Sequence, residues 1–238
     1  MKSLGIIQAR GGSKRLPRKN VKPLLGVPLI GYIVKAALAS KLTKVIVSTD
    51  DEEIAALARA FGAEVPFMRP AELAADYASD EDILFHALDW MKEHRGEDYD
   101  ILVKLHPTTP FVLPESIDSC LDTVMTTDAA CCFTARPAAD PPQWIFGLDA
   151  NRHAHTLLGD QLAGDKAHSQ LLDKYYFPTG AAYAIRVDAM RQQNCVFAEP
   201  VRLVEMDVLR SVDIDDDLDF ALAEIVGRKL GLGGESTA

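Results

Sequence analysis

The sequence predicts an α/β fold, with a doubly wound, mostly parallel sheet and helices on both of its faces. Short runs rich in Val and Ile alternate along the chain with segments of helical period, as βαβ units require. The 238 residues, 48% hydrophobic and 25% charged, are enough for one domain with a full core. We therefore expect residues 1–238 to form a single Rossmann-like domain, with its ligand at the carboxyl ends of the strands, near a switch in strand order.

The first half of the chain shows this alternation most clearly. Apolar runs typical of buried parallel strands lie at 4–9, 44–49, 101–106 and 129–135. Segments with the apolar spacing of helices lie at 28–40, 50–62, 79–94 and 114–126. The ends of these helices carry the usual signals: Ser79 as an N-cap, Pro114 in a first turn, and Gly62 and Gly96 after the last turns.

The second half begins with a stretch that breaks the pattern. Pro, Asp, Gly and His dominate from Pro137 to Pro178, which is too long for an ordinary loop, so we expect an extended hairpin or insertion subdomain at 140–178. Its aromatic residues are too few for a core of their own and must pack on something else. Beyond it we expect strands at 181–187 and 201–206, helices at 188–194 and 215–229, and a frayed tail.

The composition disfavours several classes of protein. No run of about 18 apolar residues occurs, and the apolar stretch at the N-terminus is too short for a signal peptide, which predicts a cytoplasmic location. The four cysteines form no CxxC pair, so we expect reduced thiols rather than a zinc site or a disulfide framework. A net charge of −10 argues against nucleic acid or an anionic membrane as a partner.

Positive charge is concentrated near the N-terminus. The first fifty residues contain ten Lys and Arg but a single acidic residue, Asp50. Six of these cations directly follow the first expected strand: Arg10, Lys14, Arg15, Arg18, Lys19 and Lys22. Gly11 and Gly12 permit a positive φ and a close backbone approach, so their amides could form an anion nest. The loop predicts a polyphosphate site, although a solvated surface loop would also account for its charge.

The spacing of this loop separates it from two common phosphate motifs. It matches neither GxxxxGK[ST] nor GxGxxG, so the sequence supports neither a P-loop NTPase nor a dinucleotide-binding enzyme.

An acidic motif precedes the last expected helix. Asp213 and Asp215 lie two apart in an extended segment, so both carboxylates are expected on one side, where they could hold one hard cation such as Mg²⁺. Asp216 and Asp217 are typical of the acidic residues that favour a helix start.

The basic loop reads ARGGSKRLPRKN and resembles the ARxGSKRxPxKN signature of the acylneuraminate cytidylyltransferase (CMP-sialic acid synthetase) family. The resemblance covers nearly the whole chain. It continues through RPAELAADYASDEDIL at 69–84, HPTTPF at 106–111, PTGAAYAI at 178–185 and SVDIDDDLDFALAE at 211–224.

The resemblance implies a transferase that joins CTP to a 2-keto sugar acid, sialic acid or a related nonulosonic acid, and releases pyrophosphate and a CMP-sugar for polysaccharide biosynthesis. It implies Mg²⁺ on Asp213 and Asp215, and a homodimer to which residues 140–178 contribute. The candidate nucleotide-binding residues are Arg10, Gly11, Gly12, Ser13, Lys19, Asn20, Arg69, Ala78 and Asp80. The candidate sugar-binding residues are His106, Thr108, Thr109, Ser169, Gln170, Thr179 and Gly180. The expected catalytic residues are Arg10, Lys19 and Asp213.

Three positions depart from the sialic-acid enzymes. His106 stands where they carry a glutamine, Thr179 where they carry an asparagine, and AHSQ at 167–170 replaces an expected arginine. Because these positions line the sugar side in the family, they put the identity of the sugar in doubt more than the reaction. His106 could contact the substrate, act as a general base or be a packed ring, and Arg69 could instead form a surface ion pair.

Other functions remain open at this point. A pseudaminic or legionaminic acid enzyme fits the same motifs, whereas KRLPRKN differs from the ARxxSxRLPGKP loop expected of a Kdo enzyme. A non-catalytic nucleotide-binding module would not need two carboxylates opposite a basic loop. A glycosyltransferase with a DxD motif would lack the basic glycine loop.

Overall fold

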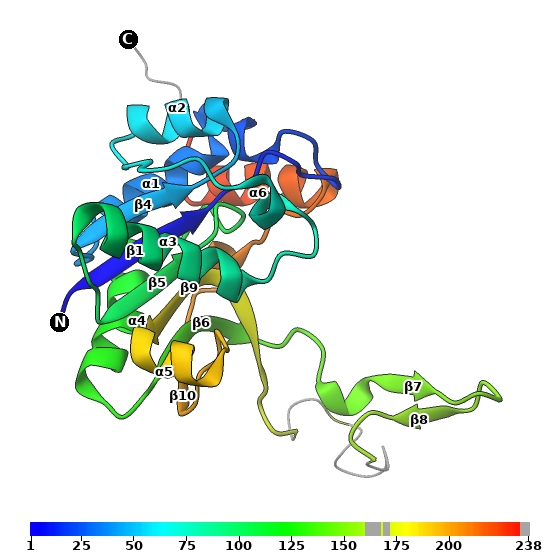
Figure 1. The fold of residues 1–238 in the computed structure, drawn as a ribbon. Helices are drawn as coiled ribbons and strands as arrows, with labels where there is room; N and C mark the ends of the chain where they lie inside the picture. Colours follow the sequence, from blue (N-terminus) through cyan, green and yellow to red (C-terminus); the bar gives the residue numbers. More distant parts are fainter. Residues whose placement is uncertain (160–167, 169–171, 234–238) are drawn as a thin grey trace.

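The fold is a six-stranded sheet between two helical layers, as a computed structural model shows (Figure 1). The structure describes residues 1–159, 168 and 172–233. The strand order is β10-β6-β9-β5-β1-β4. The strands are β1 (Ser3–Gln8), β4 (Lys44–Ser48), β5 (Ile101–Leu105), β6 (Cys131–Pro137), β9 (Tyr176–Arg186) and β10 (Val201–Glu205). The chain moves from β1 outward to β4 and then back to β5 on the other side of β1, so the strand order switches at β1.

The sheet is parallel except for β9. β1 pairs in parallel with β4 and β5, and β6 pairs in parallel with β10, but β9 runs antiparallel to both β5 and β6. β9 is antiparallel because the chain leaves the far end of β6 into the insertion and returns beside it. The four expected strands therefore do not form one continuous parallel block. Gly180, with φ of +77°, lies where the register between β6 and β9 shifts, a conformation that favours glycine.

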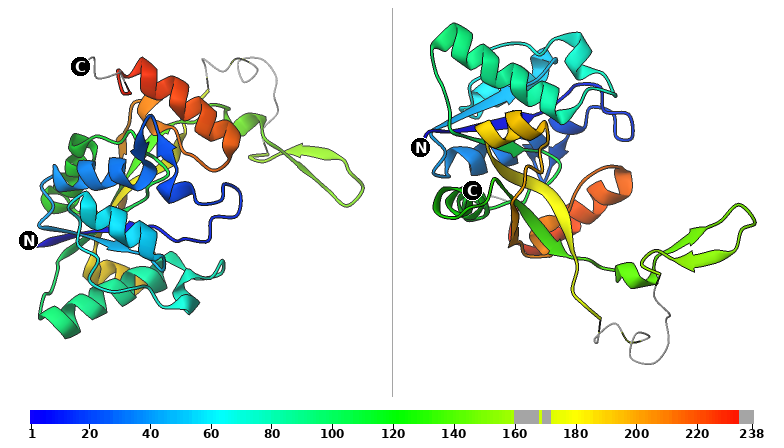
Figure 2. Two further views of the ribbon diagram at one scale, coloured as in Figure 1. Left: turned by 90° about the horizontal axis from the view of Figure 1, so that it is seen from above. Right: turned by 60° about the horizontal axis from the view of Figure 1, so that its bottom comes forward.

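Helices cover both faces of the sheet, as the sequence predicts (Figure 2). One face packs against α1 (Leu29–Leu38), α2 (Glu52–Ala60) and α4 (Pro114–Thr126). The other packs against α3 (Asp80–Arg95) and α5 (Val187–Gln193). The last helix, α6 (Asp217–Lys229), belongs to a third apolar cluster together with Leu24, Phe111 and Ile214.

The expected helix ends are confirmed. Ser79 caps α3 by accepting a hydrogen bond from the Asp82 amide, Pro114 occupies the first turn of α4, and Gly96 ends α3 in the left-handed region. Asp216 caps α6 in a capping box with Asp219. Short elements complete the main body: β2 (Pro23–Leu24), β3 (Val27–Pro28) and the 3-10 turns η1 (Lys19–Val21), η2 (Ala71–Ala74) and η6 (Leu209–Ser211).

The irregular stretch contains the expected hairpin. After η3 (Pro142–Trp144), the strands β7 (Phe146–Leu148) and β8 (Ala154–Thr156) pair in an antiparallel ribbon that projects away from the body (Figures 1 and 2). Phe146 and Leu148 are more than half exposed on it. Among the described residues, no helix has the length and apolar content to span a bilayer.

Candidate active site

A cavity of about 470 Å³ opens at the carboxyl ends of β1 and β5, beside the switch in strand order. A volume of this size suits a small-molecule ligand, and the position is the one expected for ligands in open α/β sheets. We call it the main cavity. Its polar lining residues are Gln8, Arg10, Ser13, Lys14, Arg15, Lys19, Asn20, Arg69, Asp76, Asp80, His106, Thr108 and Asp215.

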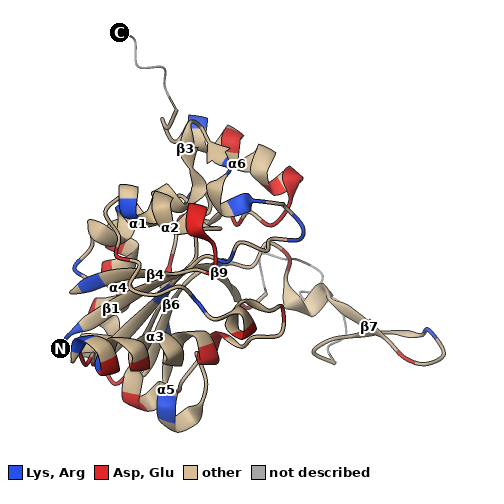
Figure 3. Ribbon diagram, turned by 45° about the horizontal axis from the view of Figure 1, so that its top comes forward, with Lys and Arg blue, Asp and Glu red and all other residues tan. Residues whose placement is uncertain are grey.

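The basic loop forms one wall of the main cavity, and acidic residues from other segments neutralise it. Asp76 binds both Arg10, at 2.9 Å, and Lys14, while Asp215 binds Arg15 at 3.2 Å. Arg15 pairs with Asp215 and Lys22 with Asp217 near the start of α6, and Figure 3 marks the acidic and basic positions along the ribbon in this region. Exposed pairs of this kind contribute at most about 1 kcal/mol each. A polyanion that binds to these cations therefore loses little free energy by breaking their ion pairs with Asp76 and Asp215.

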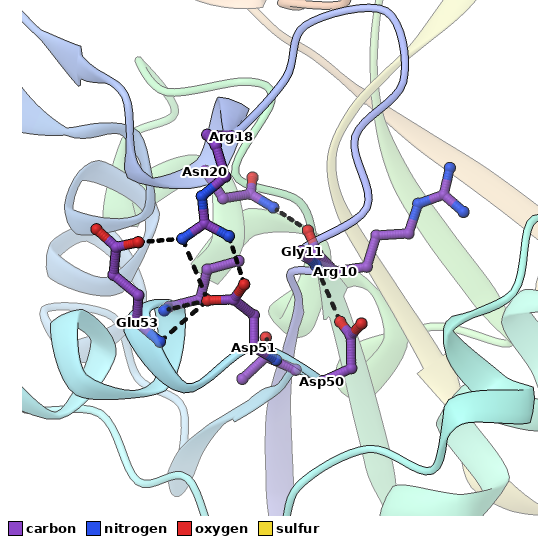
Figure 4. A network of polar contacts seen from close by, with 9 residues as sticks. Arg10, Gly11, Arg18, Asn20, Asp50, Asp51 and Glu53 are labelled. Atoms are coloured by element: carbon purple, nitrogen blue, oxygen red, sulfur yellow. Dashed lines mark hydrogen bonds and ion pairs between the residues drawn. The ribbon is translucent and has the colours of Figure 1, made fainter.

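Arg18 has a different role from its neighbours, because it lies outside the lining of the main cavity. Its guanidinium binds Asp51 and Glu53 at the start of α2, and its backbone is left-handed with φ of 58° (Figure 4). The guanidinium lowers the pKa of the Asp51 carboxyl. Arg18 therefore anchors the loop to the body of the protein.

The expected glycine nest is not formed. The Gly11 amide donates to the Asp50 carboxylate at 2.9 Å, and neither Gly11 nor Gly12 adopts a positive φ or lines the main cavity (Figure 4). Gly11 is needed for close approach instead, since a Cβ there would lie 2.7 Å from Asp51 Oδ2. The cationic groups that this wall presents to the main cavity are therefore side chains, those of Arg10, Lys14, Arg15 and Lys19.

Lys19 joins the basic loop to the acidic motif. Its side chain is buried, and Nζ donates to the Ile214 carbonyl at 2.6 Å and to Asp215 Oδ1 at 3.3 Å. Residues almost two hundred positions apart in sequence thus meet at the main cavity. This contact brings together two of the motifs that the sequence singled out.

Asp213 and Asp215 line different cavities. Asp215 lines the main cavity, whereas Asp213 lines a second cavity of about 370 Å³ together with Arg136, Thr179 and Ser211. Burial raises the pKa of the Asp213 carboxyl, and the nearby Asp215 charge acts in the same direction. Within the described ranges, no group of three or more His, Cys, Asp or Glu side chains is placed to hold a metal. The metal site therefore stays a prediction.

Arg69 also lines the main cavity, and it is not a surface ion pair. It is only 5% exposed, and its Nε and Nη2 donate to the side chain and carbonyl of Ser48 at 3.0 and 2.6 Å. Burial lowers the pKa of its guanidinium to about 10, so it keeps its charge at neutral pH. Ala78 and Asp80 also line the main cavity, and the Asp80 carboxylate is close enough to Arg69 to affect the pKa of its guanidinium.

Two polar atoms in the main cavity lack partners. Gln8 Nε2 and Asn20 Oδ1 are buried and form no hydrogen bond, although Asn20 Nδ2 donates to the Arg10 carbonyl at 2.9 Å. Unpaired buried polar atoms are costly, and both residues belong to the lining of the main cavity. Asn20 was expected here. Gln8 was missed because it reads as the last residue of a buried strand.

The candidate sugar-binding residues divide into four groups. His106 and Thr108 line the main cavity. Thr109 is fully buried and donates to the Thr179 carbonyl at 2.9 Å, so its hydroxyl is bonded within the protein and its contact with the sugar stays a prediction. Thr179 is buried at the edge of the second cavity and Gly180 provides the turn in β9. Ser169 and Gln170 lie outside the described residues.

His106 is neutral at physiological pH. Burial, assisted by the Lys104 ammonium, lowers the pKa of its imidazole to about 4 from an ordinary value of 6.5. A neutral ring offers one donor and one acceptor to a ligand. The ring is therefore suited to hydrogen bonding with a sugar or ribose hydroxyl rather than to pairing with phosphate.

This depressed pKa predicts a loss of stability in acid. Between pH 6.5 and about 4 the unfolded chain binds a proton at His106 more readily than the folded chain, so unfolding becomes more favourable as the pH falls through this window. We expect the fall in Tm between pH 7 and pH 5 to be smaller in His106→Gln by a few °C. His153→Gln, in the exposed loop of the β7–β8 hairpin, should follow the wild type. Parallel Tm profiles for both variants would contradict the assignment.

Comparisons with known proteins agree with this geometry. A model of the family described as cytidylyltransferase matches residues 4–226. The chain is 33% identical, over 93% of its length and 95% of the relative, to pseudaminic acid cytidylyltransferase from Campylobacter jejuni subsp. jejuni serotype O:2. It is 34% identical, over 96% of its length and 52% of the relative, to N-acylneuraminate cytidylyltransferase from Escherichia coli O18:K1:H7. The structure of CMP:2-keto-3-deoxy-manno-octonic acid synthetase complexed with CTP shares the fold, with a TM-score of 0.66 at 18% identity over 97% of this chain and all of that chain.

Proposed function

The chain belongs to the cytidylyltransferase family, and we propose that it joins CTP to a nonulosonic acid, giving a CMP-sugar and pyrophosphate. One observation carries this function: a single cavity at the switch in strand order is lined by the cations of the basic loop, by Asp215 and by a buried Arg69. The cations of the loop are suited to a triphosphate, and Arg69 is suited to hydrogen bonding with a nucleobase.

The reaction needs positioning and charge neutralisation rather than a covalent intermediate. The anomeric hydroxyl of the sugar acid attacks the α-phosphorus, a new P–O bond forms, and the bond to the β-phosphate oxygen breaks as pyrophosphate leaves. Arg10 and Lys14 leave Asp76 and bind the phosphate oxygens, while Lys19 stabilises the negative charge that develops on them.

Asp213 is suited to receive the proton of the attacking hydroxyl. Burial raises the pKa of its carboxyl, which makes it a stronger base than an exposed aspartate. It lines the second cavity, close enough to Asp215 and Lys19 for their charges to affect its pKa. The sugar acid would then enter from the second cavity and meet the nucleotide between the two cavities.

Mg²⁺ is the cofactor we propose for this site. The fit rests on the chemistry of the donors: Asp213 and Asp215 offer hard carboxylate oxygens, and phosphate and water oxygens would complete the coordination that Mg²⁺ prefers. When bound, the ion would neutralise charge on the transferring phosphate. Lys19 holds the Ile214 carbonyl and so fixes the backbone between the two carboxylates.

The direct test is pyrophosphate release from CTP and Mg²⁺ with a panel of sialic, pseudaminic and legionaminic acids and Kdo. We expect turnover with at least one nonulosonic acid and none with Kdo. The departures at His106 and Thr179 predict that sialic acid is not the best substrate. Binding of CTP without turnover on any acid would favour a non-catalytic nucleotide-binding module instead. CTP is a cytoplasmic metabolite, so the proposal places the protein there.

We also propose that the protein is a homodimer through the β7–β8 hairpin. Phe146, Leu148 and Ile145 are about half exposed on a ribbon that projects from the body, and a projecting apolar surface is typical of an interface. The double variant Phe146→Asp with Leu148→Asp is expected to convert a dimeric mass in light scattering to a monomeric one. Met125→Asp, at an exposed position on α4, should stay dimeric. A monomeric wild type with full activity would contradict the proposal.

A further inference from the structure

A buried lysine that the sequence did not single out pairs with Asp80, a residue that lines the main cavity. Lys104 is on β5, and its side chain is only 6% exposed. Its ammonium binds the Asp80 carboxylate and lies 4.7 Å from the centre of the Tyr183 ring. A buried ammonium is unfavourable unless it is paired, and Asp80 is its only ion-pair partner in the part of the chain that the structure describes.

The backbone holds Lys104 firmly in place. β5 lies between β1 and β9, and Lys104 is in register with Ile6 on one side and Tyr183 on the other. The backbone from which the Lys104 side chain extends is therefore held by the sheet, and the Tyr183 ring limits the movement of the ammonium. The charge that it presents to Asp80 is set by the sheet rather than by a flexible loop.

Asp80 connects this lysine to the main cavity. It is in the first turn of α3, directly after the N-cap Ser79, and its side chain is 39% exposed and lines the main cavity. Lys104 binds Oδ2, whereas Oδ1 has no hydrogen-bond partner among the described side chains and amides. One carboxylate oxygen is thus fixed, and the other can accept a hydrogen bond from a ligand.

Arg69 supplies the complementary group in the same part of the cavity. Two of its nitrogen atoms are bonded to Ser48, which leaves Nη1 to donate. A donor and an acceptor side by side match the pairing edge of cytosine, whose exocyclic amine donates and whose N3 and O2 accept. Uracil reverses the pattern, since it has an acceptor in place of the amine and a donor at N3.

We propose that Lys104 is a positioning residue for nucleobase selection, holding the Asp80 carboxylate so that Oδ1 accepts a hydrogen bond from the exocyclic amine of cytosine. The inference rests on the proposed cytidylyltransferase function and extends it to a residue outside the cavity lining. Lys104 lies outside the cavity lining, so its effect on the nucleobase is transmitted through Asp80 and not by direct contact.

The test is Lys104→Met, which keeps the length of the side chain and removes its charge. We expect the KM for CTP to rise about tenfold and the preference for CTP over UTP in kcat/KM to fall by a similar factor. Without Lys104 the Asp80 carboxylate is no longer held in place, so its hydrogen bond with the exocyclic amine of cytosine is weakened. The KM for the sugar acid should not change. Lys104→Arg should restore most of the preference, which a purely structural role would not explain.

Lys44→Met is the matched control. Lys44 is also a partly buried strand lysine between two carboxylates, Glu97 at 3.1 Å and Glu64 at 3.4 Å, but it lies at the amino end of β4, away from the cavity. Loss of ion pairs as such would affect both variants alike. We expect Lys44→Met to keep the wild-type KM for CTP and the wild-type preference over UTP.

Calorimetric binding of CTP and UTP separates this inference from the proposed function. If the wild type binds CTP in preference to UTP but turns over no sugar acid, the proposed function fails and the binding preference of Lys104→Met still decides the inference. A change in the KM of the sugar acid alone, or an unchanged nucleotide preference in folded Lys104→Met, would overturn the inference.

If Lys104→Met does not fold, Asp80→Asn replaces it. The carboxamide can donate a hydrogen bond to uracil, so the affinity for UTP relative to CTP should rise about tenfold. An unchanged ratio of the two affinities would refute the role of Asp80.

Discussion

Asp215→Asn is expected to lower turnover about a hundredfold, while Asp217→Asn is expected to leave it within about twofold of the wild type. Asp215 faces the main cavity and binds both Lys19 and Arg15. Asp217 is two residues further on, with a side chain that is 81% exposed and paired only with Lys22 among the described residues. Both substitutions replace an aspartate with an asparagine, so a difference in turnover between the two variants reflects the position of the lost carboxylate.

A Mg²⁺ titration tests whether Asp215 acts through the proposed metal. A carboxamide is a poorer ligand for Mg²⁺ than a carboxylate, so half-maximal turnover of Asp215→Asn should require more Mg²⁺, whereas Asp217→Asn should follow the wild-type titration. Loss of the pairs with Lys19 and Arg15 alone would lower turnover without shifting the Mg²⁺ titration. Equal responses of the two variants, or pyrophosphate release that persists after all divalent cations are chelated, would remove the metal from the mechanism.

Much of the fold could be predicted because each signal was local. The Val- and Ile-rich strands and the caps at Ser79 and Pro114 specify elements through residues adjacent in sequence. The direction of β9 could not be predicted in this way. It depends on how the chain returns from the insertion, and an apolar strand looks the same in either direction.

The candidate site shows the same division. The charge density of the loop is visible in the sequence and predicted a site at Arg10 and Lys19, whereas Asn20 was predicted from the resemblance to the family signature. The partners of these residues were not visible: Asp76 and the Ile214 carbonyl come from distant segments. Lys104 was missed for a further reason, since one lysine within an apolar strand is indistinguishable from a residue that extends into solvent until Asp80 is placed above it.

Three substitutions in the basic loop should separate catalysis from stability. Arg10→Ala is expected to lower kcat/KM about a hundredfold, because a cation directed at the transferring phosphate is lost. Its Tm should hardly change, since its pair with Asp76 is exposed. Arg18→Ala should show the reverse: its guanidinium anchors the loop to Asp51 and Glu53 away from the main cavity, so Tm falls while kcat/KM stays within about threefold.

Lys19→Ala should affect both properties. The buried ammonium faces the main cavity and also binds the Ile214 carbonyl, so its removal lowers kcat/KM and leaves a buried carbonyl without its partner, which costs about 1–3 kcal/mol. Sequence alone treats Lys19 and Arg10 as equivalent cations, but the structure gives only Lys19 a role in stability. Thermal melts and initial rates on the three purified variants measure both quantities. Wild-type kcat/KM in Arg10→Ala, or equal losses for Arg10→Ala and Arg18→Ala, would show that the loop acts through its overall charge and not through the side chains that line the cavity.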